Sequence, residues 1–196
     1  MKRWITGWIA ICICGIFSLS AFAQMPEEHP ARLVDTANLL SATEETILLE
    51  QLDEISRRQE ADVVIVTVSH LEDYTPQEFA KNYYKRYDYG LGLRHNGVIL
   101  LVSEECAIYT KGFVSKAVNR NGVDYLMDQV APILETKEYA KAFSLFATET
   151  DQLLEMARQG HPYKPAFNGW LYLLIGLAAA VVVFLGATVV VRLRKK

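Results

Sequence analysis

Cysteine is scarce in this chain, which has 196 residues and only three cysteines. Cys12 and Cys14 lie in an apolar amino-terminal stretch that we predict to be removed, which leaves Cys106 in the mature protein. A single thiol excludes an intrachain disulfide and a zinc site built from paired cysteines. We therefore expect a packed core to supply the stability, with Cys106 as a small strand residue.

The short motifs that mark several enzyme classes are also missing. The sequence contains no Walker loop, no His-Glu-x-x-His zinc motif and no Gly-x-Ser-x-Gly nucleophile elbow. Gly90 and Gly92 lack the third glycine of a dinucleotide-binding loop, and they precede a predicted strand rather than open a helix. We therefore assign no catalytic residue and no cofactor-binding motif from the sequence.

Positive charge is sparse in the central part of the chain. All 23 acidic residues lie between Glu27 and Glu155, whereas basic residues also occupy both terminal segments, so the central part is more acidic than the net charge of −3 indicates. Such a surface repels phosphate backbones, which excludes nucleic acid as a partner. A cation is a more natural ligand.

The amino terminus has the pattern of a secretory signal peptide. Lys2 and Arg3 form a basic start, an apolar core follows, and Ala21 and Ala23 provide a small-x-small cleavage site. An uncleaved membrane anchor is the alternative, but the apolar run is short and two serines follow it. We predict a signal peptide over residues 1–23 and a short linker over 24–31.

The carboxyl terminus has the pattern of a membrane span. Residues 170–191 are uncharged and apolar, close to the ~20 residues that a hydrocarbon core requires. Trp170 and Tyr172 lie at one end, and a basic tail (192–196) lies at the other. The positive-inside rule predicts a single-pass protein of the cell membrane, with an extracytoplasmic domain, a short tether (161–169) and a cytoplasmic tail.

Two capping boxes predict where helices begin in the outer domain. Ser41 is followed three residues later by Glu44, and apolar residues then recur at helical spacing to about Gln59. Thr75 and Glu78 form a second box, with a proline at the first helical position, and predict a helix to about residue 87. Helical periodicity returns over residues 122–134 and 139–159.

Apolar runs between these helices predict strands. Residues 61–69 and 97–103 are almost continuously apolar, as in strands covered on both faces, and the helix between them predicts parallel pairing. Residues 106–110 follow too closely for a crossover, which predicts an antiparallel hairpin. We therefore predict an α/β fold, a three-layer-like sandwich of helices around a small mixed sheet, plus the transmembrane helix.

A glycine-rich loop precedes the strand at 97–103. Gly90, Gly92 and Gly97 supply the positive φ or the close approach that loops require, while Arg94 and His95 are expected to be exposed. Since this loop enters the amino end of the strand, it lies opposite the carboxyl edge where ligands of α/β sheets usually bind. Tyrosines 83, 84, 87 and 89 are expected on buried and interfacial faces.

Acidic side chains are predicted to gather at that carboxyl edge. Oxygen-rich side chains there suit calcium or magnesium, and a solvated rim of loop acids is the alternative. The group comprises His70, Glu72, Asp73, Glu104 and Glu105. Asp35 lies just ahead of the first helix, where a turn or cap is the alternative to a ligand role.

The order of these features resembles the TPM domain, which is known from thylakoid acid phosphatase-type proteins, a photosystem II repair factor and bacterial membrane-anchored proteins. The segments "VDTANLLS" and "GLGLRHNGVILLV" carry the resemblance, which covers residues 32–160. It implies an α/β sandwich around a mixed sheet. The family motif falls on Asp35 and on four loop residues, Gly90, Gly92, Asn96 and Gly97.

The resemblance implies several functions, since some family members are described as phosphatases, some bind divalent ions, and others assist membrane complexes. This chain departs from the family in residues 116–122. The family pattern leads us to expect an aspartate there, and this chain has Asn119 and Arg120 instead. We therefore predict an interaction or assembly module for a membrane or envelope protein. The alternative is a divalent-metal-assisted phosphatase with calcium or magnesium at Asp35, Asn96, Glu104 and Glu105.

Overall fold

The computed structural model describes residues 29–165 and Leu177. The predicted signal peptide, most of the linker, the basic tail and, apart from Leu177, the predicted span lie outside the described residues. Within the described part of the chain, no helix is both long and apolar enough to cross a membrane. The predicted span and topology therefore stay predictions.

A mixed sheet forms the centre of the domain, as predicted, and it has four strands where the sequence predicted three. The strand order is β1-β2-β3-β4, and the first three strands run parallel while β4 pairs antiparallel to β3. The strands are β1 (Leu33–Asp35), β2 (Asp62–Thr67), β3 (Gly97–Val102) and β4 (Cys106–Lys111). The α/β fold class is thus confirmed.

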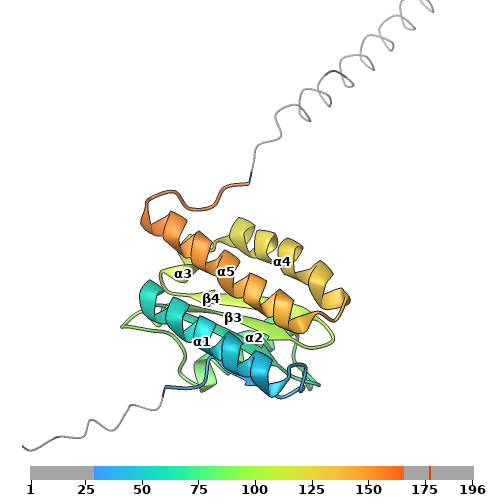
Figure 1. Cartoon of the computed structure of the whole chain (residues 1–196). Helices are drawn as coiled ribbons and strands as arrows, with labels where there is room; N and C mark the ends of the chain where they lie inside the picture. The colour runs from blue at the N-terminus through green and yellow to red at the C-terminus, as the bar shows by residue number, and fades with distance from the viewer. Residues whose placement is uncertain (1–28, 166–176, 178–196) are drawn as a thin grey trace, which may run out of the picture. The chain divides into compact units, whose positions relative to one another are not determined.

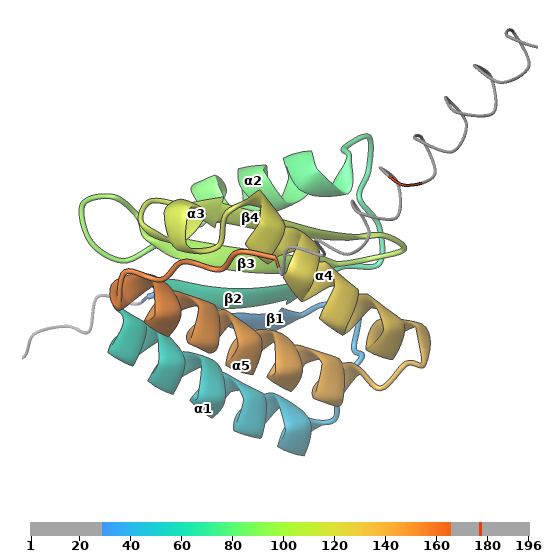
Figure 2. The same cartoon turned by 90° about the horizontal axis from the view of Figure 1, so that it is seen from above.

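Five helices cover this sheet in two layers (Figure 1). One face carries α2, and the other carries the antiparallel helices α4 and α5 together with α1, as Figure 2 shows. The helices are α1 (Ala42–Gln59), α2 (Pro76–Arg86), α3 (Val114–Ala117), α4 (Arg120–Glu135) and α5 (Tyr139–Arg158).

Alternating side chains of β2 and β3 explain why both strands are continuously apolar. Val63 and Ile65 enter the core under α1, α4 and α5, whereas Val64 and Val66 enter the core under α2. Every residue of both strands is buried. Successive side chains of a strand point to opposite faces, so a sheet covered twice needs apolar residues at every position.

The helix starts agree with the predicted caps. Ser41 with Glu44 and Thr75 with Glu78 each form both hydrogen bonds of a capping box. The sequence did not reveal β1, because three residues are too few to show a strand period. It also placed the start of α4 two residues late, since the side chain of Asn119 caps this helix.

Candidate functional site

The carboxyl edge of the sheet is the end at which β1, β2 and β3 finish, at Asp35, Thr67 and Val102. The loop after β2 and the turn after β3 enclose a hollow of about 450 Å³ there. We call it the acidic hollow, and it is lined by Ser69, His70, Leu71, Glu72, Tyr74, Pro76, Ser103, Glu104 and Glu105. The structure thus brings together four of the five side chains predicted for this edge; Asp73 does not line the hollow.

The acids of this hollow are exposed to solvent. Glu72, Glu104 and Glu105 are exposed, as is His70. The hydroxyl of Ser103 donates to the carbonyl oxygen of Glu105 across the turn, at 2.6 Å. This serine therefore shapes the turn, and among the described residues no histidine is bonded to it.

Asp35 holds a turn at the same edge but outside the acidic hollow. Its carboxylate accepts a hydrogen bond from the backbone N–H of Leu40 at 2.9 Å, and a second, short one from the Thr67 hydroxyl. The Thr67 hydroxyl oxygen in turn accepts from the N–H of Ala37. These bonds close the connection between β1 and α1, so Asp35 holds a turn, and its role as a ligand stays a prediction.

Asn96 lies at the opposite end of β3 from Glu104 and Glu105. Its side-chain oxygen accepts a hydrogen bond from the N–H of Phe113 at 2.7 Å, which ties the loop before β3 to the end of β4. A six-residue strand separates the two ends by roughly 20 Å. Asn96 is therefore not brought together with the other three residues predicted to bind metal.

Metal binding stays a prediction. Among residues 29–165 and Leu177, no group of three or more His, Cys, Asp or Glu side chains is close enough to hold a metal ion. The oxygen donors of the acidic hollow have the chemistry that calcium and magnesium prefer, but their placement does not form a cage.

The glycine loop before β3 is held by close backbone contacts. Gly90 has φ of 108°, and a Cβ there would lie 2.4 Å from the carbonyl carbon of His95. A Cβ on Gly97 would lie 2.3 Å from the hydroxyl of Tyr84. Gly92 has φ of 70° but open space around it. Gly90 and Gly97 are therefore required because other atoms lie too close for a side chain. Gly92 is required only because its φ is positive.

Asp62 is a buried anchor for this loop that the sequence analysis missed. Its carboxylate accepts from the N–H of Gly90 at 2.6 Å and from Nε of Arg32 at 3.0 Å, and its side chain has no exposed surface. Arg32 also donates to Asp53 at 2.6 Å. An acid at the start of an otherwise apolar strand was the available signal, since a buried charge needs partners.

Aromatic side chains of α2 and the glycine loop pack on the other face of the sheet. Tyr84 contacts both Tyr89 and Tyr109, and burial raises the pKa of the Tyr84 and Tyr89 hydroxyls. A second hollow of about 250 Å³ beside α2 is lined by Glu72, Tyr74, Phe79, Asn82, Tyr83, Arg86 and Tyr87. It shares Glu72 and Tyr74 with the acidic hollow, so the two hollows adjoin.

Cys106 begins β4 and is half-buried. Burial raises the pKa of its thiol, which keeps the thiol in its less reactive protonated form. The structure therefore agrees with the expected role of Cys106 as a small strand residue.

Comparisons with known proteins support one family. The family model described as "TPM domain" matches residues 33–153. No curated protein matches the chain.

Solved structures of similar fold include proteins from three bacteria. The N-terminal domain of a P. gingivalis protein aligns with a TM-score of 0.58 and 17% identity, over 70% of this chain and 90% of that one. The N-terminal domain of cg2496 from Corynebacterium glutamicum gives 0.52 and 13%, over 66% and 84%. BA42 from Bizionia argentinensis gives 0.50 and 14%, over 64% and 86%. At these identities the likeness shows the fold alone.

Proposed function

Since this chain belongs to the TPM domain family, we propose that it is a single-pass membrane protein whose outward TPM domain is an interaction or assembly module for membrane or envelope proteins. The topology rests on the sequence pattern of the two termini. Two of the similar solved structures are N-terminal domains, which fits a domain carried by a longer chain.

One observation carries this proposal: the acidic hollow adjoins the second hollow, the one beside α2 that is lined mainly by aromatic side chains. Glu104 and Glu105 supply exposed negative charge, while Tyr74 and Tyr87 are large side chains that are about half exposed. Protein interfaces commonly combine aromatic anchors with complementary charge. A protein segment with a basic residue beside an apolar one would match both hollows.

Photo-crosslinking in the intact membrane tests this proposal. A photoreactive residue at Glu104 should yield one discrete adduct of higher mass, because Glu104 lines the hollow. Glu50 is also exposed but lies in the middle of α1, so the same residue placed there is the matched control. An identical adduct pattern at both positions, or no adduct at position 104, would contradict the assignment of this surface.

A metal-assisted phosphatase is the second candidate, favoured by the carboxylates and His70 in one hollow. A bound divalent ion would supply Lewis acidity for phosphoryl transfer. The described residues offer oxygen donors but no close group of three ligating side chains, so they do not form a ready site, and we derive no reaction step from them.

Calcium, magnesium and manganese titrations of the chelator-treated full chain separate the two candidates. An ion that binds only the folded state stabilises it, by about 2.7 kcal/mol at a hundredfold excess over Kd. The melting temperature then rises. The phosphatase predicts a rise specific to one ion, together with turnover of a phosphomonoester, both lost in a Glu104→Gln, Glu105→Gln variant. Asp35→Asn is a poor probe, because Asp35 holds a turn. The interaction module predicts no turnover.

A further inference from the structure

The two ends of the domain differ in charge because of the direction of its helices. Helices α1, α2 and α5 all end beside the amino edge of the sheet, where β2 and β3 begin. Their last turns carry Arg57 and Arg58, Lys85 and Arg86, and Arg158. Of these, Arg58 is paired with Glu54 and Asp151. The first turns of α1 and α2 at the other edge carry Glu44, Glu45 and Glu78. We call the amino edge with these helix ends the basic end.

The glycine loop extends from this basic end. Leu93 at its tip is fully exposed, with a relative accessible surface of 103%, and the neighbouring Arg94 is exposed as well. The loop is well anchored, because Asp62 accepts the N–H of Gly90 and the Tyr84 hydroxyl donates to the carbonyl oxygen of His95. Leu93 and Arg94 are therefore exposed on a loop whose backbone is fixed by hydrogen bonds.

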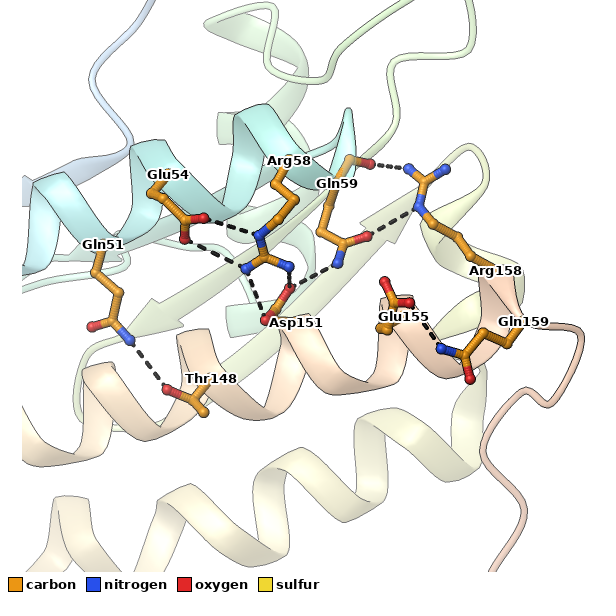
Figure 3. A network of polar contacts seen from close by, with 9 residues as sticks. All are labelled: Gln51, Glu54, Arg58, Gln59, Thr148, Asp151, Glu155, Arg158 and Gln159. Atoms are coloured by element: carbon orange, nitrogen blue, oxygen red, sulfur yellow. Dashed lines mark hydrogen bonds and ion pairs between the residues drawn. The ribbon is translucent and has the colours of Figure 1, made fainter.

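A chain of contacts joins the glycine loop to the end of α5. The side chain of Asn96 binds the backbone of Phe113, and the guanidinium of Arg158 lies 5.2 Å from the centre of the Phe113 ring. Arg158 also donates to the side chain of Gln59 at the end of α1 (Figure 3). The loop and the last turns of α1 and α5 therefore belong to one surface.

Helix α5 ends at the same surface, and beyond it Tyr163 packs against Tyr125 of α4, with ring centres 4.8 Å apart. Helix α5 ends at Arg158, and only residues 161–169 separate the domain from the predicted span at 170–191. Nine residues reach at most about 30 Å when fully extended. This length allows the predicted membrane to lie against the end of the domain that carries the basic residues and Leu93.

We propose that the basic end rests on an anionic phospholipid surface, with Leu93 inserted at the membrane interface. This inference rests on the membrane anchor of the proposed function. Basic side chains are attracted to anionic headgroups, and an exposed leucine gains from leaving water. The acidic hollow, at the opposite edge of the sheet, then faces away from the membrane, where a partner can reach it.

Fluorescence quenching in vesicles of phosphatidylglycerol and phosphatidylcholine tests this orientation. The full chain is reconstituted with Cys12, Cys14 and Cys106 replaced by alanine, and an environment-sensitive dye is attached at Leu93→Cys. Ile47→Cys is the matched control, because Ile47 is another exposed apolar residue but lies on α1. Nitroxide-labelled lipids should quench the dye at position 93 at least threefold more than the dye at position 47.

Charge reversal checks the source of the attraction. The Lys85→Glu, Arg86→Glu variant should lower quenching at position 93 at least twofold, and vesicles of phosphatidylcholine alone should do the same. Equal quenching at positions 93 and 47 in protein that floats with the vesicles would overturn the orientation while leaving the anchor intact. Protein that fails to float would overturn the anchor itself, and the orientation with it.

Discussion

The polar side chains at the two edges of the sheet differ in burial and in hydrogen bonding. At the amino edge, Asp62 is buried and bonded to Gly90 and Arg32, and glycines allow backbone segments to touch. At the carboxyl edge, Glu104 and Glu105 are exposed and line an open hollow. Buried polar groups must be paired to be tolerated, whereas exposed ones stay free for a ligand. The buried polar groups of the amino edge therefore contribute to stability, whereas the acids of the acidic hollow are available for contact.

The largest expected effect tests the crowding at the amino edge. Gly90→Ala should lower the free energy of unfolding by about 4 kcal/mol, because the new methyl group meets the His95 backbone and the residue keeps a positive φ. Gly92→Ala should cost only about 1 kcal/mol, since its φ is positive but its surroundings are open. Urea unfolding of both variants checks this difference, and equal losses would contradict the close contact.

The buried carboxylate is the next test of the amino edge. Asp62→Asn should lower the free energy of unfolding by about 3 kcal/mol, because Arg32 loses its buried counter-charge and an amide cannot accept from both partners. Asp53→Asn is the control: it removes the other, half-exposed partner of Arg32 and should cost less than about 1 kcal/mol. Similar losses in the two variants would argue against Asp62 as the anchor.

A smaller effect is expected for the acid that is bonded at the carboxyl edge. Asp35→Asn should lower the free energy of unfolding by about 2 kcal/mol, because the charge that accepts from Leu40 and Thr67 is lost. The loss should be the same with chelator and with calcium, as measured by thermal melting. A loss that appears only with calcium would instead make Asp35 a ligand.

The smallest effect belongs to the acidic hollow. The Glu104→Gln, Glu105→Gln variant should unfold within about 0.5 kcal/mol of the unchanged chain, because both side chains are exposed. The single change Glu105→Gln, in a chain with the photoreactive residue at position 104, should weaken the photo-crosslinked adduct of the interaction module. Destabilisation above 1.5 kcal/mol would show that the hollow contributes to the fold, and would remove the contrast between the edges.

The sequence predicted the elements of this fold better than it predicted the site. The capping boxes at Ser41 and Thr75, the two buried strands and the antiparallel hairpin all follow from patterns a few residues long, and the structure confirms them. Strand β1 was missed because it owes its existence to pairing with β2, which the three residues do not show by themselves.

The site residues were harder to predict, because polar side chains meet across long sequence separations. Glu104 and Glu105 share a hollow with His70 and Glu72, as the parallel-strand argument predicted. Asn96 was grouped with them from the family motif, but its strand carries it to the other edge, where it binds Phe113. The motif gives the residue types of this loop, whereas the direction of the strand, which predicted a position at the amino edge, decides where they lie.

By itself, the sequence determined where α1 and α2 begin and which runs form β2, β3 and β4, because caps, periodicity and apolar runs act between residues close together in the chain. Only the tertiary structure decided what the glycine loop is for. Gly90 meets Asp62, 28 positions away, and that carboxylate could be buried only once Arg32 was folded against it. The pairing of a buried charge depends on the whole core, so no local pattern announces it.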